Sequence, residues 1–133
     1  MVVDKKVVML VLCRKVISGL LIEAIMNRTD MDAFGLYEFK QAKGMALARQ
    51  PKIALVEIPE NRGDPARDAL DVCGDIKEVS PGCKIILICP DNDEESVAAC
   101  IEAVKEGRIN DYLFYDLSVD YLVSKLISLR PDR

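Results

Sequence analysis

The chemistry open to this chain is limited first by the residue types it lacks. Its 133 residues include no histidine and no tryptophan, but they include five cysteines and 22 carboxylates. Without histidine there can be no Ser-His-Asp or Cys-His nucleophile, no His-bound zinc and no phosphohistidine. The groups left for chemistry are thiols, carboxylates and cations, so their positions decide what they could do.

A thiol and two cations stand together at the end of the first apolar run. Cys13 ends this run, and Arg14 and Lys15 follow it directly. A cysteine that ends a strand and opens a loop into a helix is a phosphocysteine arrangement, and the two cations could lower the pKa of its thiol. Such loops need small residues so that backbone N–H groups can bind a phosphate, and the first glycine here is Gly19. A Cys13-dependent phosphotransfer enzyme is therefore a minority hypothesis, and we expect no catalytic residue.

The remaining thiols do not form a recognisable site. The cysteines have no CxxC spacing and their number is odd, which argues against a disulfide framework. We expect reduced thiols, mostly filling the core of a cytoplasmic protein. No signal-peptide pattern occurs, and no apolar run approaches the ~18 residues of a membrane helix, so we expect no membrane association. The five are Cys13, Cys73, Cys83, Cys89 and Cys100.

The charge of the chain is modest and acidic. Eighteen Lys and Arg against 22 Asp and Glu give a formal charge of −4. This balance argues against direct nucleic-acid binding by this domain, because phosphate backbones require a basic surface.

Strand-like and helix-like patterns alternate five times, which predicts the elements that position these groups. Continuous apolar runs are typical of strands buried on both faces, and joining helices then make the sheet parallel. We predict an α/β, doubly wound domain over residues 1–129, with 130–133 a tail or the start of a linker. Reactive groups should gather at the carboxyl ends of the strands. The predicted strands are 7–13, 35–39, 53–58, 85–89 and 112–115; the predicted helices are 16–27, 41–50, one from Pro65, 93–106, and one capped by Ser118.

Periodicity also predicts which side chains face the core. The first helix is expected to use Val16 and Leu20, and the fourth helix Ile101 and Val104, within their apolar faces. Cys13 and Cys89 each end a predicted strand, so both are expected near the rim of the sheet, as unreactive residues rather than as a redox pair.

Three segments carry a resemblance to a known family. Residues 42–47, 51–58 and 107–113 are similar to the second helix, the third strand and the entry to the fifth strand of receiver domains. Receiver domains are the phosphoacceptor modules of bacterial response regulators in two-component and phosphorelay signalling. The resemblance covers about residues 7–129, and it implies a five-stranded, flavodoxin-like sheet in the order 2-1-3-4-5 with five helices.

The same resemblance implies that the family's phosphorylation site is degenerate here. The acidic pair that holds Mg²⁺ falls on Cys13 and Arg14, and the phosphoacceptor aspartate falls on Glu57. The conserved hydroxyl falls on Cys89 and the conserved lysine on Tyr115. A thiol and a guanidinium cannot replace two carboxylates around Mg²⁺. We therefore expect a pseudo-receiver with no metal site and no cofactor.

Glu57 allows three interpretations. It could mimic a permanently phosphorylated aspartate, it could accept phosphate atypically without the metal, or it could simply form an ion pair with Arg14 or Lys15. The ion pair is favoured, because the cation would replace the missing metal.

The resemblance also implies where partners bind. Receivers commonly make contacts through the fourth helix, the fifth strand and the fifth helix. We expect a protein partner or a homodimer, and a DNA-binding output domain outside this chain is one target that such contacts would regulate. The candidate interface residues are Val97, Lys105, Asp111, Tyr112 and Asp120.

Overall fold

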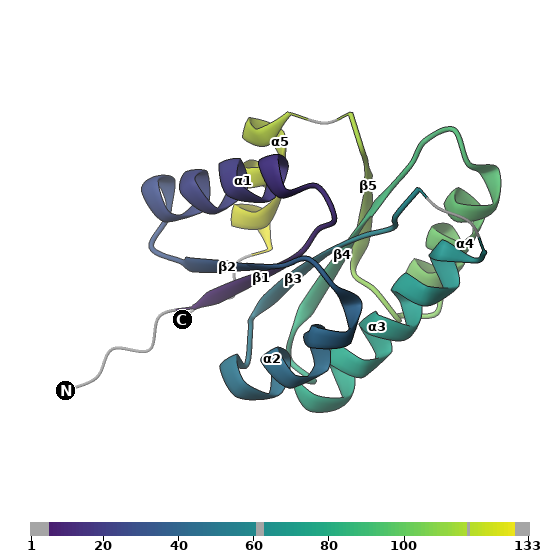
Figure 1. Cartoon of the computed structure of the whole chain (residues 1–133), viewed down its shortest axis with the longest axis horizontal. Coiled ribbons are helices and arrows are strands. Elements are labelled where there is room, and N and C mark those ends of the chain that lie inside the picture. Colours follow the sequence, from purple (N-terminus) through teal and green to yellow (C-terminus); the bar gives the residue numbers. More distant parts are fainter. Residues whose placement is uncertain (1–5, 61–62, 117, 130–133) are drawn as a thin grey trace.

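Five parallel strands form the central layer of the chain, seen here in a computed structural model that describes residues 6–60, 63–116 and 118–129. Their order is β2-β1-β3-β4-β5, so the predicted 2-1-3-4-5 sheet is confirmed (Figure 1). The strands are β1 (Val7–Val11), β2 (Asp32–Leu36), β3 (Ile53–Glu57), β4 (Lys84–Cys89) and β5 (Asp111–Phe114).

Five helices cover the two faces of this sheet. In Figure 1, α1 and α5 lie on one face, and α2, α3 and α4 lie on the other. A short 3₁₀ turn, η1 (Phe39–Gln41), leads from β2 into α2. The helices are α1 (Lys15–Arg28), α2 (Ala42–Arg49), α3 (Pro65–Val79), α4 (Glu94–Lys105) and α5 (Val119–Ser128).

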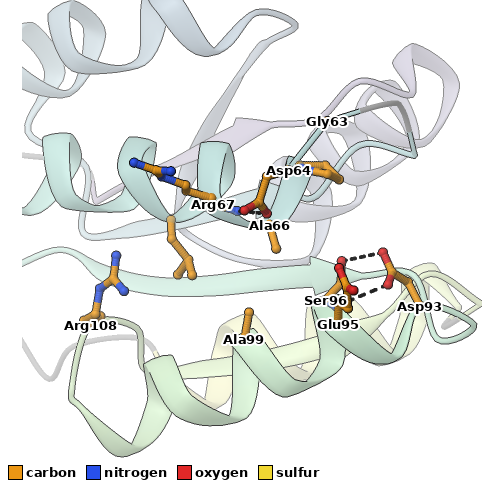
Figure 2. A pocket seen from close by; sticks show the side chains of 11 residues that line it. Gly63, Asp64, Ala66, Arg67, Asp93, Glu95, Ser96, Ala99 and Arg108 are labelled. Atoms are coloured by element: carbon orange, nitrogen blue, oxygen red, sulfur yellow. Dashed lines mark hydrogen bonds between the residues drawn. The ribbon is translucent and has the colours of Figure 1, made fainter.

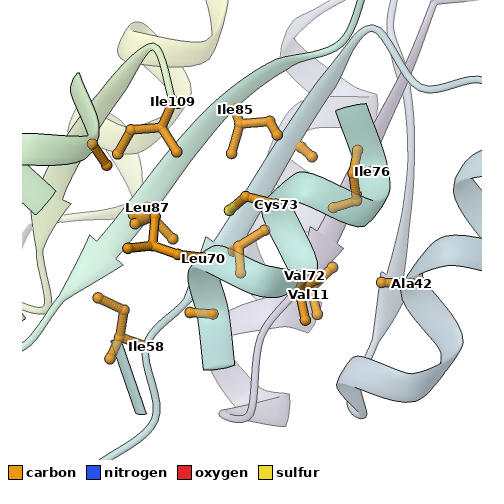
Figure 3. Packing of buried hydrophobic residues seen from close by; sticks show 14 of the residues in the cluster. Val11, Ala42, Ile58, Leu70, Val72, Cys73, Ile76, Ile85, Leu87 and Ile109 are labelled. Carbon is orange, nitrogen blue, oxygen red and sulfur yellow. The ribbon is translucent and has the colours of Figure 1, made fainter. Parts of the chain in front are cut away.

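The two faces enclose separate hydrophobic cores. All five residues of β3 are buried, and the first four are apolar, since each face of a central parallel strand packs against helices. Figure 3 shows α3 placing Leu70, Cys73 and Ile76 in the same cluster as Ile85 and Leu87 of β4. The opposite cluster is built mainly from α1, α5 and the alternate strand residues.

Local capping residues set the helix ends that the sequence predicted. Asp64 accepts a hydrogen bond from the Arg67 backbone N–H, and Pro65 occupies the first helical position of α3. Ser118 caps α5 by accepting from the Tyr121 N–H. Gly107 follows α4 with a φ of 75°, a left-handed conformation that glycine adopts without strain.

The second strand and two helix faces differ from the predictions. β2 spans Asp32–Leu36 rather than residues 35–39, because Phe39 enters the 3₁₀ turn. Val16 and Leu20 point outward from α1, and Ile101 and Val104 from α4. Both helices carry apolar residues on more than one side, and the buried stripes include small residues such as Ser18 in α1 and Ala103 in α4. Among the described helices, none is long and apolar enough to cross a membrane.

Candidate functional site

The carboxyl edge of the sheet brings four of the predicted site residues into one network. Cys13 and Arg14 follow β1, and Glu57 is the last residue of the neighbouring strand β3. Tyr115 directly follows β5. Parallel strands end at the same edge, so residues that are far apart in sequence meet there.

Glu57 is a buried carboxylate whose two oxygens both accept hydrogen bonds. Its side chain is 1% exposed. Oε1 accepts from the backbone N–H of Cys13 at 2.9 Å and from that of Arg14 at 3.3 Å. Oε2 accepts from the Arg14 Nε–H, which forms the ion pair. A buried carboxylate needs such donors, because it has lost its water shell.

Glu57 forms its ion pair with Arg14 and not with Lys15. The Nζ of Lys15 lies 5.2 Å from the centre of the ring of Tyr37, the residue that follows β2. The favoured interpretation of Glu57, a carboxylate paired with an adjacent cation, therefore matches the structure. Arg14 retains 37% exposure of its side chain, so the pair has one buried and one half-exposed member.

Tyr115, just after β5, is the last member of the network. The Arg14 guanidinium carbon lies 4.5 Å from the centre of the Tyr115 ring, a cation–π contact. The Tyr115 hydroxyl donates a hydrogen bond to the carbonyl oxygen of Ile58, the residue after Glu57. Burial, followed by the charge of Glu57, raises the pKa of Tyr115, so its hydroxyl stays protonated and continues to donate.

Cys89 ends β4 at this edge of the sheet, as expected, but its side chain does not belong to the network. Alternate residues of β4 face opposite sides of the sheet, which turns Cys89 into the core under α3 and α4. Its Sγ donates to the Pro90 carbonyl oxygen at 3.3 Å. The Cys100 thiol of α4 hydrogen-bonds to it, and this bond lowers the pKa of Cys89 and raises that of Cys100.

The Cys13 thiol is exposed but not activated. Partial burial, and then the negative charge of Glu57, raise its pKa and outweigh the opposing effect of Arg14. The sequence-based expectation that neighbouring cations lower this pKa is therefore wrong. In addition, the backbone N–H groups of Cys13 and Arg14 already donate to Glu57. The other four thiols are buried, as expected for core residues.

The predicted interface residues lie on α4, β5 and α5 but have different surroundings. Asp111 pairs with Lys125 of α5 at 2.5 Å, whereas Asp120 pairs with Arg28 of α1 at 2.5 Å. Tyr112 is half-buried and meets Phe114 edge-on, with ring centres 5.8 Å apart. Val97 is half-buried and Lys105 is exposed.

A second concave feature was missed by sequence reasoning. A groove of about 480 Å³ runs between α3 and α4, and we call it the α3–α4 groove (Figure 2). Its lining comes from two helices and the segments next to them, so no single motif marks it. The only sequence signals at this place were the helix starts at Pro65 and Asp93, which explain the local caps but not a hollow. Its principal lining residues are Asp64, Arg67, Leu70, Asp93, Ala99 and Arg108.

Solved structures share this fold at low sequence identity. A response regulator from Thermotoga maritima superposes with a TM-score of 0.74 at 15% identity, covering 94% of this chain and 97% of that chain. A two-component response regulator from Clostridium difficile gives 0.72 at 17% identity, covering 94% and 95%. A LuxR-family DNA-binding response regulator from Staphylococcus aureus gives 0.73 at 13% identity, covering 93% and 98%.

These likenesses establish the fold predicted from the resemblance. The chain has the five-stranded, flavodoxin-like fold of response-regulator receiver domains. Comparison of the sequence with family models and with curated proteins gave no match. Within the described residues, no group of three or more His, Cys, Asp or Glu side chains is arranged to hold a metal ion.

Proposed function

We propose that this receiver-fold chain is a signalling module in which an internal ion pair replaces the phosphorylation site, and that it acts through protein–protein contacts. The observation that carries the proposal is the state of Glu57. Both carboxylate oxygens are engaged, by Arg14 and by the backbone N–H groups of Cys13 and Arg14, in a side chain that is 1% exposed.

This arrangement disfavours phosphate transfer to Glu57. An attacking carboxylate oxygen must be within reach of the donor phosphorus, and the burial of Glu57 prevents that approach. Mg²⁺ prefers several oxygen ligands, whereas the residues beside Glu57 offer a thiol and a guanidinium. The Arg14 cation would also repel the metal. The residues at this edge do not fit Mg²⁺, and the proposed module works without it or any other cofactor.

The network favours a single, fixed state of the module. The Arg14 guanidinium bridges Glu57 and the Tyr115 ring, and the Tyr115 hydroxyl bonds to the Ile58 carbonyl. Each side chain therefore limits the rotamers of the next one. A module of this kind offers partners one constant surface, in contrast to a site that changes on phosphorylation.

The face made by α4, β5 and α5 is the surface we assign to the partner. It exposes Ile101 to 40% and Val104 to 36%, beside the charged side chain of Lys105. An apolar centre with a charged rim suits a protein surface. The partner is a second copy or another cytoplasmic signalling protein; a DNA-binding output domain, if one follows, would supply the basic surface that this domain lacks.

Acetyl phosphate labelling tests the proposal. The protein is incubated with this donor, with and without Mg²⁺, and its intact mass is recorded; we expect no phosphate adduct under either condition. Glu57→Gln and Cys13→Ser are the matched variants. An adduct that disappears in Glu57→Gln would show an atypical phosphoacceptor and contradict the proposal. An adduct that disappears in Cys13→Ser would instead support the phosphocysteine enzyme.

A further inference from the structure

The α3–α4 groove has opposite charges at its two ends. Figure 2 shows the guanidinium groups of Arg67 and Arg108 toward one end, and the side chains of Asp64 and Asp93 toward the other. Figure 2 shows Ala66 and Ala99 between the two ends, and the apolar side chain of Leu70 also lines the groove. The groove therefore suits an elongated occupant with an apolar middle, an anionic group at one end and a cationic group at the other.

The charges at the arginine end are weakly compensated. Arg108 has a single ion-pair contact, to Glu106 at 3.9 Å, and Arg67 makes no ion pair within residues 6–60, 63–116 and 118–129. At the other end, the Asp93 carboxylate accepts from the Ser96 hydroxyl at 2.8 Å, and Glu95 is exposed. An occupant carrying both charges would gain electrostatic complementarity at each end.

The exposed face of α1 presents this combination of groups. Val16 is 76% exposed and Leu20 is 48% exposed, four residues apart and therefore on the same side of the helix. Glu23 continues this face one turn later, and Lys15 flanks it in the first turn. The order along the helix is thus cation, two apolar residues, anion.

The lengths of the two features also agree. Eight residues separate Lys15 and Glu23, which corresponds to about 12 Å along a helix. The 12 residues of α4, which forms one wall of the groove, extend about 18 Å. The side chains of Lys15 and Glu23 can therefore reach opposite ends of the groove while Val16 and Leu20 lie between them.

We propose that α1 of one copy of this chain docks into the α3–α4 groove of a second copy. Leu20 and Val16 pack on the apolar floor around Leu70, Glu23 approaches the two arginines, and Lys15 approaches Asp93 and Glu95. In this arrangement α1 lies parallel to α4 of the other copy.

The geometry of the fold makes this contact a head-to-tail one. The α1 face and the groove lie on opposite sides of the sheet (Figure 1), so each docked pair leaves one α1 and one groove free. Heterologous contacts of this kind add further copies unless a ring closes. A single helix in a groove buries little area, so we expect weak, concentration-dependent association.

Sedimentation velocity with two complementary variants tests the proposal. Leu20→Lys places a charge in the docking face of α1, and Arg67→Glu reverses a charge in the groove. We expect the average mass of the wild type to rise with concentration and that of each variant to stay at the monomer. Mixed in equal amounts, the variants supply one intact α1 and one intact groove, and we expect a dimer that grows no further.

Other outcomes distinguish this interface from the α4–β5–α5 surface. Val104→Glu adds a charge to that surface and is expected to leave head-to-tail association unchanged. If Val104→Glu abolishes association while Leu20→Lys does not, the head-to-tail proposal is wrong and the proposed partner surface stands. A wild type that remains monomeric throughout, or a mixture that forms no dimer although both variants show native circular dichroism, would also overturn it.

Discussion

Removing Arg14 should destabilise the protein more than neutralising Glu57, although the two side chains form one pair. Arg14→Met leaves a carboxylate with 1% exposure and only two backbone donors. The lost charge-assisted hydrogen bond contributes about 1.5–3 kcal/mol and the contact with the Tyr115 ring about 0.5–1 kcal/mol. Because Arg14 is 37% exposed, water screens part of this interaction, and we expect a net loss of about 2 kcal/mol.

Glu57→Gln should lower the free energy of unfolding by about 1 kcal/mol. The amide oxygen of the glutamine can still accept from the backbone, and Arg14, which then has no partner charge, can reach water. The double variant should lose only about 1.5 kcal/mol, because the neutral side chain no longer needs a cation. The coupling free energy is then about 1.5 kcal/mol in a double-mutant cycle.

Urea unfolding measures these differences through tyrosine fluorescence and far-ultraviolet circular dichroism, since the chain has four tyrosines and no tryptophan. Arg28→Met is the matched control: it breaks the exposed pair with Asp120, with side-chain exposures of 52% and 78%, and should cost less than about 1 kcal/mol. The reasoning is refuted if Arg14→Met costs no more than this control, or if the two single effects simply add.

Four further predictions concern buried groups and thiols. Ser18 is buried and its hydroxyl has no hydrogen-bond partner among the described residues, so Ser18→Ala should be neutral or stabilise the fold by up to about 1 kcal/mol. A Cβ on Gly35 would lie 2.7 Å from that hydroxyl, so Gly35→Ala should lower the free energy of unfolding by about 1–3 kcal/mol. The loss should be measurably smaller in the Ser18→Ala background, which lacks the hydroxyl. Equal shifts of the urea midpoint in the two backgrounds would contradict this prediction. Native alkylation followed by mass spectrometry should modify Cys13 alone, with the other four thiols reacting only after unfolding, and fast labelling of a second thiol would argue against the buried placement. Finally, burial raises the pKa of Cys73 and Cys83 to about 12 from 9.0, so the unfolded state loses these protons first and the free energy of unfolding should fall from about pH 9 toward about pH 12. Each thiol contributes up to about 1.4 kcal/mol per pH unit, so Cys83→Ala should make the fall shallower than in the wild type.

The strands and the place of the site could be predicted because their signals are local. A central parallel strand is apolar over most of its length, as residues 53–56 are, and the carboxyl ends of the strands mark the edge where a site is expected. Glu57, Arg14 and Tyr115 were placed at one edge by this reasoning together with the family resemblance. Their meeting follows from strand order, and the structure confirms that order.

What the sequence could not decide depends on the direction of side chains. Arg14 and Lys15 are adjacent cations, and only the path from β1 into α1 determines which one reaches Glu57. Cys89 was expected to share the site with the other residues, but the alternation of side chains along β4 turns it into the core. Val16 and Leu20 fit a helical period as well as buried residues do, so periodicity alone cannot identify the outer face of a helix that is apolar on several sides.

The ion pair at the sheet edge determines which conditions can open this part of the protein. A site that binds an external ion or phosphate responds to the concentration of that ligand. Here the counterion of Glu57 is tethered to the same chain, so this corner forms when the chain folds and opens only when it unfolds locally. Its open fraction is therefore set by local stability, and it changes with temperature, denaturant or mutation. Hydrogen exchange of the Cys13 and Arg14 amides, which donate to Glu57, reports the rate and free energy of that opening directly.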